Sequence, residues 1–211
     1  MYNGIFLSFE GSDGTGKTSI IKLVQKKIKN NFPKIKVLIT SELGGTFFGK
    51  HLRKYVFDKK RINPLTRTYL FAAARAQNVE EVILPNLKDG NLIIADRYLD
   101  SSIVYQGLWE KVGIQKVKSI NEYAVQNIHP QLVFVLYASS QKTITNIKRR
   151  KEYADNFDET NVDIKKQVMD WYIKLAQQNK KYVLIDANKD IDSTFQNVWE
   201  KIEPLILKHY C

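Results

Sequence analysis

The residues whose types and spacing could do chemistry begin at Gly11, where the sequence satisfies the pattern G-x-x-x-x-G-K-[ST]. Glycines at this spacing let successive backbone N–H groups turn inward onto phosphate oxygens. Lys17 can reach the β- and γ-phosphates, and the hydroxyl of Thr18 suits Mg²⁺. The motif therefore predicts a triphosphate-binding loop made of Gly11, Ser12, Asp13, Gly14, Thr15, Gly16, Lys17 and Thr18.

The segments on either side of this loop fit the prediction. The apolar run 5–9 predicts a buried strand, and residues 19–24 begin an amphipathic helix whose N-terminus would face the anion. A glycine turn without a ligand is the alternative, and this context disfavours it.

A second candidate site follows the most apolar segment, residues 91–95. Asp96 stands at the end of that predicted strand, from where a carboxylate can hold Mg²⁺ or its waters beside a phosphate loop. Arg97 comes next and can meet a phosphate as a fork of donors. Asp96 is therefore expected with Thr18 at a magnesium site.

Phe71 and Arg75 lie one turn apart on a predicted helix from Pro64 to about Leu84, hence on one face. An aromatic ring and a guanidinium presented together could stack on a planar base and hydrogen-bond to it. The alternative is that Phe71 belongs to the core and Arg75 pairs with an acid. Taken alone, these residues favour the alternative.

The elements that must position these residues alternate between strands and helices. Apolar runs predict strands at 5–9, 36–40, 91–95, 132–137 and 182–187. Helices are expected between and after them, including one over 49–58 with Leu52 and Val56 inward and Tyr55 as a further candidate. The pattern predicts an α/β fold in which a five-stranded parallel sheet carries helices on both faces. We expect a single domain over residues 1–211.

Composition limits the classes of function. The 211 residues carry a formal net charge of +11, which invites a nucleic-acid partner. The lysines are scattered, however, and pairs such as Lys165–Lys166 are interpreted as solvated helix faces, so we expect no nucleic acid. No apolar segment approaches the roughly 20 residues of a membrane span, so no membrane partner is expected. The single cysteine, Cys211, fits a reducing, cytoplasmic location.

Several motifs together resemble the thymidylate kinase family, most closely its bacterial type. They are Phe-Glu-Gly-Ser-Asp-Gly-Thr-Gly-Lys-Thr at 9–18, Glu-x-Gly-Gly-Thr at 42–46, Phe-Ala-Ala-Ala-Arg-Ala-Gln at 71–77 and Asp-Arg-Tyr-Leu-Asp-Ser-Ser-Ile-Val-Tyr-Gln-Gly at 96–107. The resemblance implies the P-loop nucleoside monophosphate kinase fold and a homodimer. It also implies transfer of the γ-phosphate of ATP, bound with Mg²⁺, to dTMP.

The resemblance implies a role for each matching position and favours the base-binding interpretation of the long helix. Phe71 would stack on thymine and Arg75 would donate to a thymine carbonyl. Tyr105 would crowd the 2′ position of the sugar, and Asp13 would orient the acceptor. The remaining substrate-binding positions are Glu42, Ser102 and Gln106, with Arg53 and Arg97 on the acceptor phosphate.

The chain also departs from the family pattern. Ser41 stands where an acceptor-phosphate arginine is usual, and Gly14 stands where the eukaryotic type carries a catalytic arginine. Asn156 occupies a position in the expected flap, about 149–161, where an arginine is common. Arg149 and Arg150 are then the candidates for the charge on the transferred phosphoryl group, beside Lys17, Asp13 and Arg97 as catalytic residues.

Two other functions remain open at this point. A deoxynucleoside kinase on a related P-loop fold would phosphorylate thymidine or deoxycytidine instead. A regulatory protein that binds ATP without a phosphoryl acceptor would fit the positive charge.

Overall fold

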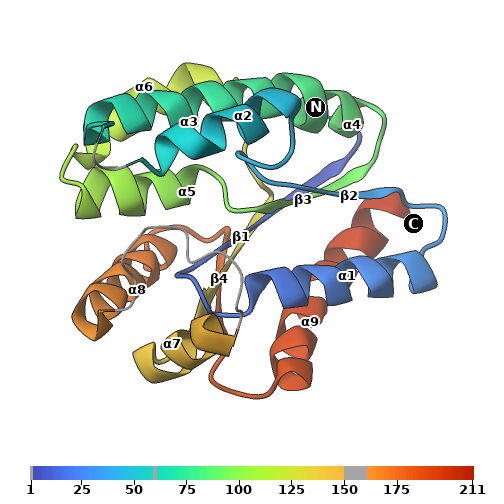
Figure 1. The fold of residues 1–211 in the computed structure, drawn as a ribbon. Helices are drawn as coiled ribbons and strands as arrows, with labels where there is room; N and C mark the ends of the chain where they lie inside the picture. The colour runs from blue at the N-terminus through green and yellow to red at the C-terminus, as the bar shows by residue number, and fades with distance from the viewer. Residues whose placement is uncertain (1, 59–60, 150–160) are drawn as a thin grey trace.

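A computed structural model describes residues 2–58, 61–149 and 161–211. Its centre is a parallel five-stranded sheet in the order β2-β3-β1-β4-β5, with helices on both sides (Figure 1). The strands are β1 (Ile5–Glu10), β2 (Val37–Thr40), β3 (Leu92–Asp96), β4 (Leu132–Tyr137) and β5 (Tyr182–Asp186). The α/β class and the five predicted strands are therefore confirmed.

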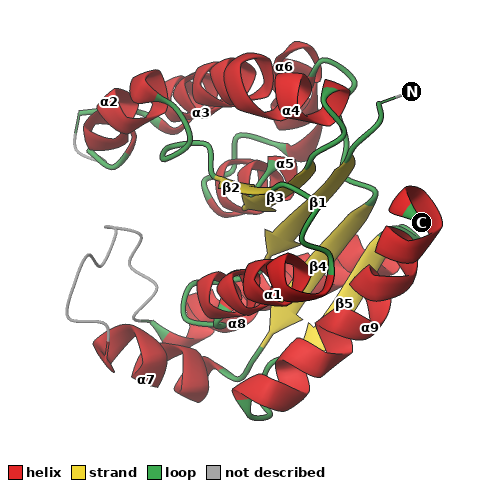
Figure 2. Ribbon diagram, turned by 90° about the vertical axis from the view of Figure 1, so that its right-hand side faces the viewer, coloured by secondary structure: helices red, strands yellow, loops and turns green. Residues whose placement is uncertain are grey.

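The central strand β1 is buried along its whole length because helices cover both faces of the sheet. On one face, Ile5, Leu7 and Phe9 pack against α1 (Lys17–Asn31) and α9 (Ile191–Tyr210). Figure 2 shows these two helices lying along the sheet. Alternate side chains of the strand point the other way, and Phe6 belongs to a separate cluster.

The opposite face is covered by helices from the middle of the chain and by α8. They are α3 (Pro64–Asn78), α4 (Leu84–Lys88), α5 (Leu99–Ser102), α6 (Ile114–Val125) and α8 (Val162–Gln177), with the π-helical segments η1 (Val79–Ile83) and η2 (Ile103–Trp109). Phe6 and Ile93 pack there against η1 and α4, whereas Val133 and Val135 of β4 pack against α8. The helix α2 (Phe47–Val56) packs on α3.

The long helix that begins at Pro64 continues further than expected. Asn63 caps it by accepting from the N–H of Thr66 at 2.8 Å, and helical backbone runs through η1 into α4 as far as Lys88. Pro85 lacks an N–H and would interrupt a regular α-helix, but it falls in the first turn of α4, directly after the π-helical segment. The expected end near Leu84 was therefore wrong.

A smaller correction concerns α2. Val56 is buried as expected, but Tyr55 is 49% exposed and does not face inward. Thr46 caps the start of the helix, and its side chain accepts from the N–H of Gly49 at 2.9 Å. This cap places Arg53 two turns into the helix, where it lines the cavity described below.

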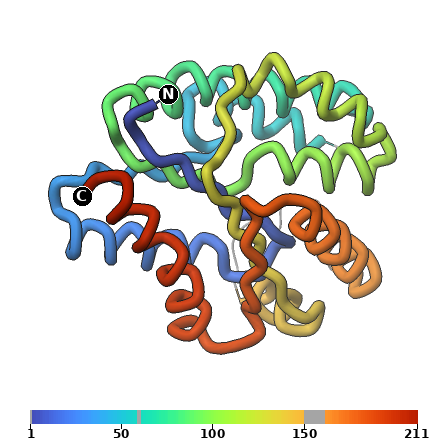
Figure 3. Tube along the Cα trace, turned by 180° about the vertical axis from the view of Figure 1, so that it is seen from behind, coloured from blue at the N-terminus to red at the C-terminus, as the bar shows by residue number. Residues whose placement is uncertain are grey.

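The two ends of the described chain meet at the edge of the structure away from the phosphate loop. The hydroxyl of Tyr210 accepts from the N–H of Ile5 at 3.3 Å, and the ring of His209 lies 2.9 Å from the carbonyl oxygen of Asn3. The last turn of α9 thus lies beside the start of β1 (Figure 3). Among the described residues, no helix is both long and apolar enough to cross a membrane.

Between α7 (Ser140–Arg149) and α8 the structure describes only Asn161, the residue that caps α8. The expected flap over 149–161 therefore lies almost entirely outside the described residues, and Arg150 lies outside them too.

Candidate active site

The predicted phosphate loop connects β1 to α1. Its glycines adopt positive φ angles, 129° at Gly11 and 86° at Gly14. A side chain is excluded at either position, because a Cβ would lie 2.3 Å from the carbonyl oxygen of Leu136 or of Thr143. Both positions thus require glycine, because of their backbone conformation and because neighbouring backbone atoms approach closely.

Lys17 is the first residue of α1 and lies folded back over this loop. Its side chain is buried, and Nζ donates to the carbonyl oxygens of Gly11 and Ser12, both at 2.9 Å. A cation therefore lies beside the backbone N–H groups that the N-terminus of α1 presents. Both features attract an anion to this point.

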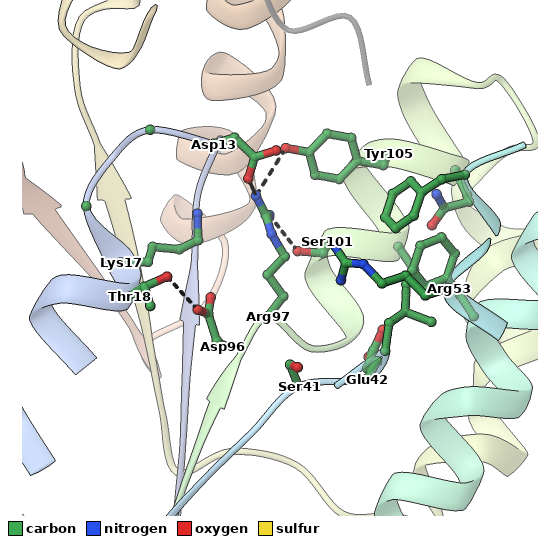
Figure 4. Close-up of a pocket in the computed structure, with 17 residues that line it drawn as sticks. Asp13, Lys17, Thr18, Ser41, Glu42, Arg53, Asp96, Arg97, Ser101 and Tyr105 are labelled. Carbon is green, nitrogen blue, oxygen red and sulfur yellow. Dashed lines mark hydrogen bonds and ion pairs between the residues drawn. The ribbon is translucent and has the colours of Figure 1, made fainter. Parts of the chain in front are cut away.

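Thr18 and Asp96 meet beside the loop. Parallel pairing of β1 and β3 aligns Phe9 with Asp96, which brings the carboxyl end of β3 next to the start of the loop. The Thr18 hydroxyl donates to Oδ2 of Asp96 at 2.9 Å (Figure 4). The pair offers a hydroxyl and a carboxylate oxygen, which are hard donors of the kind that Mg²⁺ prefers.

Arg97 is the centre of a hydrogen-bond cluster. It adopts φ 74°, a left-handed conformation that is uncommon outside glycine. Its guanidinium pairs with the carboxylate of Asp13 and donates to Ser101 Oγ at 3.0 Å and to the Tyr172 hydroxyl at 3.1 Å. It also lies 5.3 Å from the ring centre of Tyr105. Figure 4 shows Arg97 between the phosphate loop and the Tyr105 side of the cavity.

The charges around Asp13 keep it ionised. Desolvation near the loop raises the pKa of this carboxyl, but Arg97 and Lys17 outweigh that effect and lower the pKa to about 2. The Asp13 side chain is still 44% exposed, so it can meet a ligand as well as Arg97. Asp13 is therefore a negative group available at neutral pH.

The pKa of Glu10, at the end of β1, is shifted in the opposite direction. Burial raises the pKa of Glu10 to about 8, and the nearby charge of Asp100 adds to the rise. Glu10 accepts from the N–H of Tyr98 at 2.7 Å and from the hydroxyl of Ser101 at 2.6 Å. It thus holds the segment that follows Arg97.

A cavity of about 380 Å³ joins these groups to the predicted base-binding residues. It is lined by the phosphate loop and the Thr18–Asp96 pair and also by Phe71 and Gln106. Figure 4 shows the loop and the pair on one side of Arg97, and Tyr105 and Arg53 on the other. Arg97 lines the wall between these two sides. The other lining residues are Ser41, Glu42, Leu43, Arg53, Phe57, Ser101, Ser102 and Tyr105, with Asp13, Gly14, Gly16 and Lys17 from the loop.

Arg75 lies behind the wall of the cavity. It is completely buried and pairs with the carboxylate of Glu42, and its guanidinium also bonds to Asn121. A further donor reaches Ser102 Oγ at 2.8 Å. Arg75 therefore pairs with an acid, as the alternative to base binding expected. Phe71, one turn away, lines the cavity.

The predicted site residues occupy different positions relative to the cavity. Those that line the cavity come from both the phosphate and the base motifs. Gly11, Ser12 and Thr15 lie within the loop beneath it, and Arg75 is buried behind it. Arg149 is the last residue of α7, and Arg150 falls outside the described residues.

Sequence reasoning missed a contribution from α8. Lys165, interpreted as part of a solvated face, is 1% exposed, so that interpretation was wrong. Its Nζ donates to the backbone carbonyl of Asp13 at 3.1 Å. The signal was available, because Val168, Met169 and Tyr172 follow Lys165 at i+3, i+4 and i+7, the spacing of one buried helix face.

Comparison with known proteins gives the family. The sequence matches the family of thymidylate kinase over residues 9–198. The chain belongs to the thymidylate kinase family. It is 33% identical over 210 residues to thymidylate kinase of Mycoplasma mobile, covering 97% of this chain and 100% of that one. It is 35% identical over 206 residues to thymidylate kinase of Thermosipho africanus, covering 97% and 98%.

A solved structure shows the same fold. The crystal structure of thymidylate kinase from Ehrlichia chaffeensis matches with a TM-score of 0.76 and 23% identity, covering 96% of this chain and 98% of that chain. The resemblance drawn from the motifs is thereby confirmed for family and fold. Membership in the thymidylate kinase family does not favour a deoxynucleoside kinase or an ATP-binding regulator.

Proposed function

We propose that this protein transfers the γ-phosphate of ATP to dTMP, giving dTDP and ADP, in the cavity between the phosphate loop and Phe71. The supporting observation is that one cavity is lined both by the anion-binding phosphate loop and by an aromatic ring and an amide, those of Phe71 and Gln106. Phosphoryl transfer needs a donor and an acceptor held in line, with positive charge around the transferred group. A single cavity of this kind holds both.

The donor end takes ATP. The backbone N–H groups of residues 11–18 bind its phosphates, and the N-terminus of α1 points at them. Lys17 exchanges its bonds to the loop carbonyls for bonds to the β- and γ-phosphates. Its buried position keeps the ammonium close to where the phosphate chain lies.

The acceptor end takes dTMP. Phe71 stacks on thymine, and Gln106 and Ser102 meet the polar edge of the base, with Arg75 bonding to Ser102 from behind. Tyr105 stands where it crowds the 2′ position of the sugar. Glu42 completes this end through its pair with Arg75.

The acceptor phosphate lies between the two ends. Arg97 and Arg53 grip it, and both line the cavity. Asp13 orients the acceptor while it holds Arg97 in place. Arg149 and Arg150 are the proposed sources of further charge on the transferred group.

Mg²⁺ belongs beside Thr18 and Asp96. Within residues 2–58, 61–149 and 161–211, no group of three or more His, Cys, Asp or Glu side chains could hold a metal ion. An ion held by one carboxylate, one hydroxyl, phosphate oxygens and waters is the arrangement that Mg²⁺ adopts in kinases. When bound, the ion neutralises charge on the phosphate oxygens.

The protein acts as a cytoplasmic homodimer in this proposal. Exposed apolar side chains on α3 and α6 support self-association, with Leu65 at 41%, Tyr69 at 55% and Tyr123 at 86% exposure. The free cysteine, Cys211, fits a reducing compartment. Light scattering during gel filtration measures the mass directly, and a monomer at micromolar concentration would contradict the dimer.

A coupled assay of ADP formation tests the activity. With ATP and Mg²⁺ present, dTMP is the expected acceptor, while thymidine and deoxycytidine give no turnover. Some turnover of dUMP is expected, because one methyl group in an apolar pocket is worth only about 1–3 kcal/mol. Absence of dTMP phosphorylation, or preference for a nucleoside, contradicts the proposal.

A further inference from the structure

Side chains from α7 and α8 bond the outer side of the phosphate loop. Lys165 Nζ of α8 donates to the carbonyl oxygen of Asp13 at 3.1 Å, and Asn146 Nδ2 of α7 donates to that of Gly14 at 2.8 Å. In a trans peptide the carbonyl and the following N–H point in opposite directions. Carbonyls that are held outward at residues 13 and 14 therefore aim the next N–H groups toward the phosphates.

The burial of Lys165 is unusual for a lysine. Its relative exposure is 1%, whereas the next residue, Lys166, is exposed. A buried ammonium is costly unless it is hydrogen-bonded or balanced by an opposite charge. Lys165 has both kinds of partner, because its ammonium bonds to the Asp13 carbonyl and acts on the negative charge of the Asp13 carboxylate. An apolar residue of similar length could fill the same space without that cost.

The position of Lys165 places its charge behind the anion site. Asp13 and Gly14 both line the cavity, and Lys17 lies on the inner side of the same loop. The loop is therefore held between an inner cation, which can contact phosphate, and an outer cation, which contacts backbone.

We propose that Lys165 is a positioning residue for the phosphate loop, which holds the Asp13 carbonyl outward and keeps the following N–H groups aimed at the β-phosphate of the donor nucleotide. This inference depends on the proposed function, since it assigns the loop to ATP. Lys165 would act through the backbone of the loop, which its ammonium contacts. Loss of Lys165 should weaken the binding of nucleotides that carry a β-phosphate and leave the binding of other nucleotides unchanged.

The test compares Lys165→Met with Lys166→Met in the full chain. Both changes remove one positive charge from neighbouring positions of α8, but only the first removes the bond to the loop. Titration calorimetry with ADP, AMP and dTMP should show ADP bound at least about tenfold more weakly by Lys165→Met, as expected for loss of a charge-assisted hydrogen bond. Binding of AMP and dTMP should change by less than about twofold, and Lys166→Met should match the unmodified protein for every ligand.

A conservative variant separates positioning from packing. Lys165→Arg keeps the charge and the donor and should recover most of the ADP affinity. If Lys165→Met does not fold, Lys165→Gln takes its place, with the same expected loss for ADP. Equal weakening of ADP, AMP and dTMP, or ADP binding equal to that of Lys166→Met, overturns the proposal.

The unmodified protein shows which hypothesis has failed. If it does not phosphorylate dTMP, the proposed function is wrong. If it does, and Lys165→Met binds ADP normally, only the role of Lys165 is wrong.

Discussion

Replacing Arg75 by methionine removes one partner of a buried ion pair. The side chains of Arg75 and Glu42 are 0% and 7% exposed, so the carboxylate left behind has little access to water. Breaking a buried pair in this way typically costs about 3–5 kcal/mol. At about 2–4 °C per kcal/mol for a protein of this size, the melting temperature should fall by about 6–20 °C.

Removing both charges should restore much of the loss. The double variant Arg75→Met with Glu42→Leu buries two apolar side chains where the pair was, and such replacements are often close to neutral. Urea denaturation of the unmodified protein, both single variants and the double variant completes a double-mutant cycle. Tryptophan fluorescence can report unfolding, because the chain contains three tryptophans.

The result also separates the two interpretations of Arg75. If Arg75 acts on the base, the double variant should regain stability but still bind dTMP weakly. Its affinity for ADP should be unchanged, and Glu42→Leu alone serves as the control for the loss of the carboxylate. A loss below about 1 kcal/mol for Arg75→Met, or strictly additive effects in the cycle, would refute the reasoning from burial. Normal dTMP binding by the double variant would leave Arg75 a purely structural role.

The remaining predictions concern the metal and pH. Asp96→Asn should raise the Mg²⁺ concentration for half-maximal rate by about tenfold or more, since metal affinity falls by this order when a supporting carboxylate is lost. An unchanged midpoint in a titration of the rate with Mg²⁺ would exclude Asp96 from the magnesium site. The pKa of Glu10 is about 8 in the folded protein against an ordinary 4.5, so the folded state holds the extra proton between these values. The contribution of Glu10 to the free energy of unfolding should therefore be greatest below the ordinary value and should fall by up to about 1.4 kcal/mol per pH unit until the folded pKa is passed. Glu10→Gln should flatten that slope in urea titrations at a series of pH values, and an equal slope in both proteins would contradict the shift.

Features encoded by neighbouring residues were predictable from the sequence. The phosphate loop is local, because Gly11 and Gly14 supply the positive φ angles that its turn requires. The strands are apolar runs of ordinary length, and their buried positions follow from helices on both faces of a parallel sheet. Asp96 could be placed beside Thr18 since it ends a strand next to the loop.

Features that depend on distant partners were not predictable in the same way. Whether a lysine is solvated or buried is decided by what packs on its helix, and the partner of Lys165 lies 152 residues away in the chain. Arg75 likewise meets its acid 33 residues upstream. Local propensity also gives no sign of the π-helical segment η2, which carries Tyr105 into the wall of the cavity.

The backbone of Arg97 explains how two adjacent residues, Asp96 and Arg97, both line one cavity. Successive side chains of a strand point to opposite faces, so a regular continuation of β3 would carry Arg97 away from the side that Asp96 occupies. The φ angle of 74° ends the strand and directs both side chains to the cavity, Asp96 toward Thr18 and Arg97 toward Asp13 (Figure 4). Such a conformation costs about 1–3 kcal/mol and persists where surrounding bonds determine it. Those bonds come from Asp13, Ser101 and Tyr172, so the strain is maintained at the point where donor and acceptor phosphates would meet.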